Sequence, residues 1–288
     1  MDVASRIEQA LNNALSRADV SGCPPRLAAA MRYAVFPKGA RIRPRLCHSV
    51  AAACGEDHPA AADAAGAALE LLHSASLVHD DLPCFDAADI RRGRPSVHKA
   101  FGEPLAVLAG DALIVLAFQT LASLRDVPDR MAMLTVTVAQ AVGVPFGIVA
   151  GQAWECEPQI DLAHYHRAKT GALFAAASVA GAAAAGVDAE PWRLLGDKLG
   201  EAYQVADDIR DAAADEDEIG KPVGQDVAHG RPSAVIAYGL DGAVHHLHQL
   251  VRDAIAAMPP CENGHELRAL MMSEARRLVP AKLAQFAA

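Results

Sequence analysis

Aromatic residues are scarce in this chain of 288 residues, at 5% of the sequence, whereas hydrophobic residues make up 52%. Alanine and leucine supply much of the apolar content, and signals for β-strands are nearly absent. Small aliphatic side chains favour close packing of helix on helix. No change in composition and no linker rich in Gly and Ser divides the chain. We therefore expect one all-α domain over residues 1–288, a bundle of about ten or more helices.

The sequence also lacks an excess of positive charge, because its net charge is -9. Binding to a nucleic-acid backbone requires a basic face, so we expect no nucleic-acid partner. The six cysteines show no CxxC spacing, which predicts reduced thiols in a cytoplasmic protein. No positively charged leader followed by an apolar run opens the chain, so no secretory signal is expected.

Prolines and apolar periodicity predict helices near residues 2–17, 25–36, 41–54, 60–81, 104–124, 129–143, 161–185, 189–214, 232–257 and 265–285. The ninth of these should break near Gly239. The stretch from Thr170 to Val187 is uncharged and has nearly the length of a membrane span. It consists mostly of Ala and Gly with Ser178 inside, so we predict a buried helix and not an integral membrane protein.

Two clusters of carboxylates lie against this apolar background. Asp207 and Asp211 are four residues apart and should share one face of a helix, whereas Pro83 must break the helix before Asp86 is reached. Neighbouring carboxylates repel one another unless divalent cations lie between them, and oxygen ligands suit Mg²⁺. The sequence therefore predicts metal sites at Asp80, Asp81, Asp86, Asp207, Asp208 and Asp211.

Basic residues alternate with these acidic clusters along the chain. Arg91 and Arg92 follow the first cluster, and Lys221 and Arg231 follow the second. A single DDxxD match usually marks a solvated helix end. Two such clusters, each followed by basic residues, indicate instead a polyphosphate held by metal ions on one side and by Arg and Lys on the other.

Two long segments resemble the aspartate-rich motifs of the trans-prenyl diphosphate synthases. They are HSASLVHDDLPCFDAADIRRGRPSVHKAFGE at residues 73–103 and YQVADDIRDAAADEDEIGKPVGQDVAHGRPSAV at residues 203–235. GARIRP (39–44), LAGDALI (108–114), GQAWE (151–155) and YHRAKTGALF (165–174) extend the resemblance over most of the chain. The likeness is strongest to the bacterial geranylgeranyl diphosphate synthases of carotenoid and chlorophyll-type pathways. It implies the isoprenoid synthase fold, with helices around a central cavity, and a homodimer.

The resemblance implies a role for each acidic residue and for several basic ones. Mg²⁺ would be the cofactor, with three ions in each active site. Its direct ligands would be Asp80, Asp86 and Asp207, with Asp81, Asp208 and Asp211 bound directly or through water. The residues assigned to catalysis are Asp80, Asp86, Lys169, Asp207 and Lys221.

By the same resemblance, two groups of residues would hold the two diphosphates. The allylic diphosphate is assigned to Arg91, Lys169 and Lys221, supported by hydrogen bonds donated by Thr170 and Gln204. Isopentenyl diphosphate, which binds without metal ions, is assigned to Arg43, His73 and Arg92. His73 and Asp80 are seven residues apart and should share a helix face. Arg41 and Arg231 are either helpers or surface charges.

Three positions depart from the family pattern. Ala40 occupies the place of a lysine in the first basic motif, so one contact with isopentenyl diphosphate is missing or comes from Lys38 or Arg41. Ala88 stands where an aspartate is common, and Glu155 stands where GQxxD would end in Asp. None of the three replaces an assigned metal ligand, so we still expect activity.

The implied reaction joins isopentenyl diphosphate head to tail to an allylic primer: dimethylallyl, geranyl or farnesyl diphosphate. The small residues Ala75 and Ser76, one turn before the first cluster, leave room for a long tail and predict the twenty-carbon product geranylgeranyl diphosphate. Farnesyl diphosphate is the alternative product. A class I terpene cyclase and a non-catalytic synthase subunit are alternative functions. The second cluster, Asp207 to Asp211, argues against the cyclase, and the presence of both acidic clusters argues against the subunit. The helix from Pro104 to Leu124 is the candidate dimer face.

Overall fold

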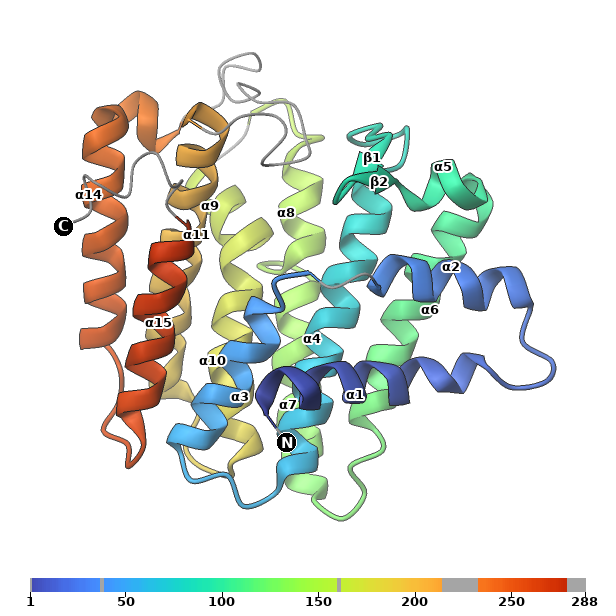
Figure 1. Cartoon of the computed structure of the whole chain (residues 1–288), viewed down its shortest axis with the longest axis horizontal. Helices are drawn as coiled ribbons and strands as arrows, with labels where there is room; N and C mark the ends of the chain where they lie inside the picture. The colour runs from blue at the N-terminus through green and yellow to red at the C-terminus, as the bar shows by residue number, and fades with distance from the viewer. Residues whose placement is uncertain (1, 37–38, 160–161, 214–232, 279–288) are drawn as a thin grey trace. The chain divides into compact units, whose positions relative to one another are not determined.

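The computed structural model describes residues 2–36, 39–159, 162–213 and 233–278, and the regular structure of these residues is almost entirely helical (Figure 1). The prediction of an all-α protein is confirmed. Single turns of 3₁₀-helix are η1 (Ser16–Ala18) and η3 (Glu190–Trp192). The other elements are α1 (Val3–Leu15), α2 (Pro25–Val35), α3 (Ile42–Ala53), α4 (Pro59–Asp80), β1 (Ile90–Arg91), β2 (Arg94–Pro95), α5 (Val97–Phe101), α6 (Glu103–Leu121), α7 (Pro128–Val142), α8 (Ile148–Trp154), α9 (Leu162–His166), the π-helical turn η2 (Arg167–Gly171), α10 (Ala172–Ala184), α11 (Arg193–Ala213), α14 (Ala234–Ala256) and α15 (Gly264–Leu278).

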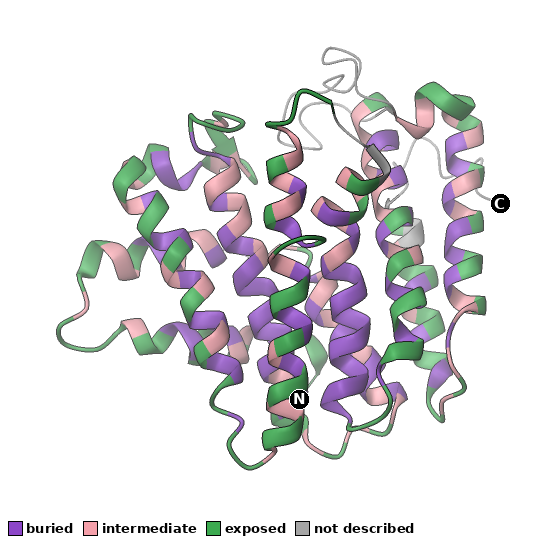
Figure 2. Ribbon diagram, turned by 180° about the vertical axis from the view of Figure 1, so that it is seen from behind, coloured by how far each residue is buried: buried purple, intermediate pink, exposed green. Residues whose placement is uncertain are grey.

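The chain forms two compact units. The first comprises Met1–Val138 and Ala180–Asp188, and the second comprises Ala139–Val179 and Ala189–Ala288. Within each unit, several helices carry both buried and exposed residues, whereas others are buried along most of their length (Figure 2). A single domain and a central cavity stay predictions.

The first unit is built around α4, which packs against α6, α3 and α1. Most of its 22 residues are buried, and many of them are alanines. A side chain at Gly66 would lie 3.2 Å from the imidazole of His48 on α3, and a side chain at Gly110 on α6 would overlap His79 on α4. The helices approach this closely because the facing residues are small, which is how a chain poor in aromatics fills its core.

Arg41 carries a buried charge at the start of α3. It is only 6% exposed and hydrogen bonds to the carboxylates of Glu70 (2.6 Å) and Glu8 (3.0 Å) and to the carbonyl of Val35 (2.9 Å). A buried guanidinium requires such partners, because removing it from water is costly. Arg41 therefore ties α1, α3 and α4 together, and the alternative that it is a surface charge is wrong.

The second unit is built on the packing of α11 against α14. Ala202, Ala206 and Ile209 of α11 are buried against Leu247 and Val251 of α14. Gly239 interrupts α14 with φ 70° and ψ 169°, so the predicted break at this glycine is confirmed. The positive φ is one that a residue without Cβ adopts readily.

The helix predicted over 161–185 is interrupted by the π-helical turn η2, which sequence periodicity did not indicate. The short helices α5 and α8 and the hairpin β1–β2 were likewise not predicted. Residues 173–185 are all buried, which confirms a buried helix for the uncharged stretch. One described helix, α6, has the length and apolar composition of a membrane span, with 44% of the tested window buried. Core helices of soluble proteins meet the same test, so α6 alone does not indicate a membrane protein.

His48 makes the stability of the first unit depend on pH. It is 2% exposed, and burial lowers its pKa from 6.5 to about 4, an effect that the charge of Arg6 reinforces. The fold therefore favours the neutral imidazole, whereas the unfolded chain takes up a proton near pH 6.5. The contribution of this group is complete above pH 6.5 and is lost as the pH falls toward 4, by about 3 kcal/mol in total.

Replacing His48 with Met removes the titrating group and keeps a side chain of similar volume. Denaturant unfolding should show that the wild type loses ~3 kcal/mol more than His48→Met between about pH 7 and about pH 4. Glu56 opposes this loss, and so does Asp63, whose Oδ1 lies 3.6 Å from Nε2, because their charge favours the imidazolium. Parallel pH profiles for the two proteins would contradict the assignment.

Candidate active site

The first acidic cluster is a tight turn at the end of α4. The helix ends at Asp80, and Pro83 follows in the turn, as the sequence predicted. The backbone N–H of Asp86 then donates to the carbonyl of Asp80 at 3.0 Å. Carboxylate oxygens of Asp80 and Asp86 lie within 4.8 Å of each other. This donor set consists of hard oxygen ligands, which fits Mg²⁺.

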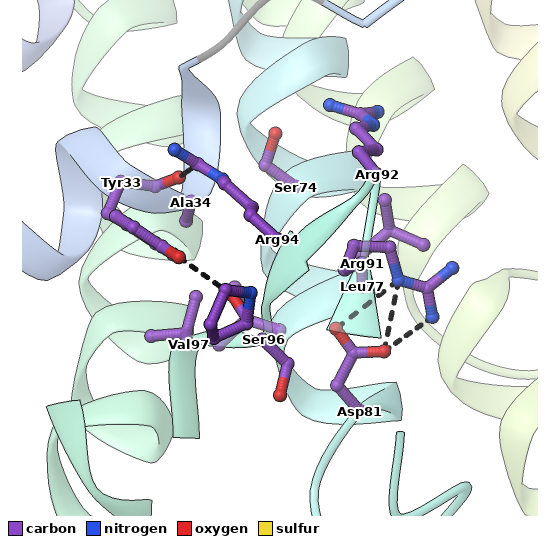
Figure 3. A pocket seen from close by; sticks show the side chains of 12 residues that line it. Tyr33, Ala34, Ser74, Leu77, Asp81, Arg91, Arg92, Arg94, Ser96 and Val97 are labelled. Atoms are coloured by element: carbon purple, nitrogen blue, oxygen red, sulfur yellow. Dashed lines mark hydrogen bonds and ion pairs between the residues drawn. The ribbon is translucent and has the colours of Figure 1, made fainter. Parts of the chain in front are cut away.

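Asp81 differs from these two residues because it is buried, at 2% exposure. Its carboxylate accepts hydrogen bonds from the guanidinium of Arg91, at 3.0 Å from Nε and 2.5 Å from Nη2 (Figure 3). Burial raises the pKa of Asp81, and the bond from Arg91 opposes that shift. Asp81 thus holds Arg91, one of the predicted allylic residues, on the hairpin side of the cluster.

The hairpin β1–β2 turns sharply at Arg92 and Gly93. Both have positive φ, 55° and 74°, as tight hairpin turns require. Such a φ is uncommon for Arg and is found where the surrounding structure enforces it. Here the Arg92 guanidinium lies against the backbone of Gly39, where a Cβ would lie 2.7 Å from Nη2.

Arg94 anchors the other strand of the hairpin. Its guanidinium stacks over the ring of Tyr33, 3.6 Å from the centroid, and donates to the carbonyls of Tyr33 and Phe36. Figure 3 shows Arg94 turned toward α2, while Arg91 turns toward Asp81. Arg94 thus fixes the strand that follows Arg92. Sequence reasoning missed Arg94, although it stands in the same RRGR run.

The structure brings together the three residues assigned to isopentenyl diphosphate. Burial lowers the pKa of His73 well below its usual value, and the nearby charges of Arg43 and Arg92 lower it further. His73 is therefore neutral, and the charges of Arg43 and Arg92 lie near it. A small cavity beside this group is lined by Tyr33, Ser74, Leu77, Arg91, Arg92 and Arg94 (Figure 3).

The second acidic cluster lies on α11 in the second unit. Asp207 and Asp211 are both half-buried, and Arg210 forms an ion pair with Asp207. Asp208 is 5% exposed and accepts hydrogen bonds from Gln204 at 3.0 Å and from the backbone N–H of Ala234 at 2.8 Å. Burial raises the pKa of Asp208, and these bonds oppose that shift. The three carboxylates therefore occupy different environments.

Lys169 lies on the π-helical turn η2 and pairs with Glu155, Nζ to Oε1 at 2.5 Å. Glu155 also accepts from the hydroxyl of Tyr165 at 2.6 Å and from the amide of Gln152 at 3.0 Å. A Cβ at Gly151 would lie 2.5 Å from the backbone nitrogen of Lys169, so α8 and η2 approach closely. π-Helical turns recur at functional sites.

Glu155 was noted in the sequence as a departure from GQxxD but was given no role. Its longer side chain reaches the ammonium of Lys169, and the GQAWE motif was the signal for it. The predicted supporting pair is in contact, because the hydroxyl of Thr170 donates to Oε1 of Gln204 at 3.1 Å. Lys38, Lys221 and Arg231 lie outside the described residues. Arg41 is committed to its buried carboxylates, so it does not replace the lysine absent at position 40.

A family model identifies the chain. The model described as polyprenyl synthetase matches residues 24–270. This chain belongs to the polyprenyl synthetase family. A geranylgeranyl diphosphate synthase of Cereibacter sphaeroides is 54% identical to it over 285 residues, 99% of each protein. A farnesyl diphosphate synthase of Geobacillus stearothermophilus is 40% identical over 250 residues, which are 82% of this chain and 83% of that protein.

A solved structure of a geranyltransferase from Legionella pneumophila matches this polyprenyl synthetase with a TM-score of 0.80 at 26% identity, covering 96% of this chain and 94% of that one. The predicted family, the isoprenoid synthase fold and the transferase activity are confirmed. The roles of individual site residues stay predictions.

The grouping of basic residues predicts that the two substrates respond to different substitutions. Arg43→Ala should raise the Michaelis constant mainly for isopentenyl diphosphate, because Arg43 lies beside His73. Lys169→Ala should raise it mainly for the allylic diphosphate. Loss of one charged contact corresponds to about a 10-fold change or more.

Steady-state kinetics with each substrate varied in turn checks this prediction. Lys198→Ala is a matched control, since Lys198 is paired with Glu201 on α11 outside the predicted site. Equal changes for both substrates in either variant would show that the grouping is wrong.

Proposed function

We propose that this polyprenyl synthetase is a Mg²⁺-dependent geranylgeranyl diphosphate synthase that extends allylic diphosphates with isopentenyl diphosphate. The observation that carries the proposal is the turn that holds the carboxylates of Asp80 and Asp86 within 4.8 Å of each other. In the same unit, Arg91 is fixed by Asp81, and His73 lies near Arg43 and Arg92. Acidic ligands and anion-binding cations thus occur together, as a metal-bound diphosphate requires.

The reaction separates an allylic cation from a pyrophosphate. The carbon–oxygen bond of the allylic diphosphate breaks, and its electron pair leaves with the pyrophosphate. The double bond of isopentenyl diphosphate then forms the new carbon–carbon bond, and loss of a proton restores an alkene. Bound Mg²⁺, three ions by the family resemblance, would act as a Lewis acid on the departing oxygens, held by Asp80, Asp86 and Asp207.

The remaining side chains hold charge in fixed positions. Arg91 and Lys169 would offset the negative charge that develops on the pyrophosphate, and each is already oriented by a carboxylate partner, Asp81 or Glu155. Preorganised charge of this kind needs no rearrangement during the reaction. Arg43, Arg92 and neutral His73 would hold isopentenyl diphosphate without metal ions.

Product length depends on α4 in this proposal. Ala75 and Ser76 have small side chains and lie about one turn before Asp80. Ala75 is 1% exposed, and the hydroxyl of Ser76 donates to the carbonyl of His73. The twenty-carbon product is also favoured by the higher identity to the Cereibacter enzyme than to the Geobacillus farnesyl diphosphate synthase. That second relative makes the fifteen-carbon product the alternative.

The proposal includes a homodimer, and α6 and α7 offer an apolar surface for it. Val107, Leu108 and Val115 of α6 and Met133 and Val136 of α7 are exposed apolar residues within the first unit. A second copy of the chain would cover them in a homodimer.

None of the six cysteines forms a disulfide, in keeping with a cytoplasmic enzyme. Its isoprenoid product would supply a pathway of the carotenoid or chlorophyll type.

Metal dependence tests the proposed function directly. With Mg²⁺, isopentenyl diphosphate and each allylic primer, the purified protein should form a product identified by mass as geranylgeranyl diphosphate. Chelation of Mg²⁺ should abolish turnover. Asp80→Asn should lower the rate by at least ~10²-fold, the scale of losing one main electrostatic stabiliser.

Asp89→Asn is the matched control, since Asp89 follows the same cluster but is exposed and paired with Lys99. Calorimetric titration with Mg²⁺ and pyrophosphate should show weaker binding to Asp80→Asn and unchanged binding to the control. Near-normal turnover of Asp80→Asn would contradict the assignment of Asp80 as a metal ligand.

Ala75→Tyr tests the product length. If Ala75 lines the path of the growing tail, the variant should stay folded and shift the product to fifteen carbons. If Ala75 is small only to let helices pack, the added ring should lower stability by ~1–3 kcal/mol and leave the product unchanged. Mass analysis of products together with thermal unfolding separates the two, and Ala75→Ser is a control of nearly unchanged volume.

A further inference from the structure

Asp208 differs from its neighbours Asp207 and Asp211 in burial and in hydrogen bonding. It is 5% exposed, while those two are half-buried. Each of its carboxylate oxygens accepts a hydrogen bond: Oδ1 from Nε2 of Gln204 at 3.0 Å and Oδ2 from the backbone N–H of Ala234 at 2.8 Å. Each of the two oxygens thus has a hydrogen-bond donor within the second unit.

The charge of Asp208 fixes the orientation of Gln204. An ionised carboxylate only accepts hydrogen bonds, so the NH₂ end of the Gln204 amide must face it. The oxygen of the amide then faces Thr170, whose hydroxyl donates to it at 3.1 Å. The proton of Thr170 is therefore committed to Gln204, and the hydroxyl offers its lone pairs on its other side. Sequence reasoning had assigned Thr170 as a donor to the substrate.

The second oxygen of Asp208 holds the start of α14. Ser233 caps this helix through its side chain, and Ala234 provides the first helical N–H. The first N–H groups of a helix have no partner within the helix, and negative charge is favourable there. Asp208 supplies both an acceptor and a charge, which connects α11 to the N-terminus of α14.

We propose that Asp208 is a positioning residue and not a metal ligand. It sets the direction of the hydrogen bonds from Thr170 through Gln204 and anchors the N-terminus of α14. Thr170 follows Lys169, so the proposal deepens the proposed function, on which it rests: through the orientation of Thr170, Asp208 would direct the lone pairs of the hydroxyl toward the positive charge that develops on the allylic carbon.

Asparagine at position 208 should reverse the orientation of the relay. Its amide oxygen can still accept from Ala234, but its NH₂ group would face that of Gln204 and force the Gln204 amide to turn over. Asp208→Asn should therefore lower kcat/KM for the allylic diphosphate about 10-fold or more. Thr170→Val in the Asp208→Asn background should lower it little further, because the relay is already broken.

Metal binding distinguishes a positioning residue from a ligand. Asp207→Asn is the matched control, because Asp207 is the neighbouring carboxylate and a predicted ligand. Titration with Mg²⁺ in the presence of pyrophosphate should give a weakened constant for Asp207→Asn and a constant within about 2-fold of the wild type for Asp208→Asn. A similar weakening in both variants would overturn the proposal, and so would multiplicative losses in the Thr170→Val double variant.

A third measurement does not depend on turnover. In the metal-free protein, Gln204→Met and Thr170→Val should each lower Tm, and the double variant should lower it by less than the sum, because both remove the same relay. These variants leave the contact of Asp208 with α14 in place and remain usable should Asp208→Asn fail to fold. Additive Tm shifts in the double variant would overturn the proposed relay, even if the enzyme is active. Failure of the wild-type protein to form any product would overturn the proposed function but not the relay.

Discussion

Repulsion between neighbouring carboxylates is the constraint on which the candidate site depends. Each cluster places carboxylates next to one another on or beside a helix, an arrangement that is unfavourable without positive charge or hydrogen-bond donors. The buried carboxylate of each cluster has its own partner. Arg91 pairs with Asp81, and Gln204 together with the N-terminus of α14 donates to Asp208. The carboxylates that are more exposed to solvent, such as Asp86, are the ones that we propose as metal ligands. The proposed division of roles within each acidic cluster rests on which carboxylates already have hydrogen-bond donors within the protein.

The same logic extends to the cations. Arg91 and Lys169 are each held by a carboxylate, while Arg43 and Arg92 lie near neutral His73. The cations assigned to the allylic diphosphate, Arg91 and Lys169, are thus fixed by acidic partners, whereas two of those assigned to isopentenyl diphosphate lie near an uncharged imidazole.

Local patterns in the sequence predicted the long helices, the break at Gly239 and the turn at Pro83, because proline, glycine and apolar spacing act within a few residues. Residues that work through distant partners were not predictable in this way. Arg41 reaches a carboxylate 29 residues away, and Asp208 reaches a backbone group 26 residues away. Glu155 was visible only as an irregularity in a motif. The resemblance to a family assigned the candidate site residues, but it gave the same possible role, a metal ligand directly or through water, to Asp81, Asp208 and Asp211.

A substitution at Gly151 could inactivate this enzyme without any change in its charged residues. Its backbone lies so near that of Lys169 that a single methyl group would push α8 and η2 apart. Every aspartate, arginine and lysine of the site would remain in the sequence of such a variant. Natural variants in this family therefore cannot be classed as active from their ionisable residues alone, and the glycine of the GQxxE segment belongs among the positions that decide it.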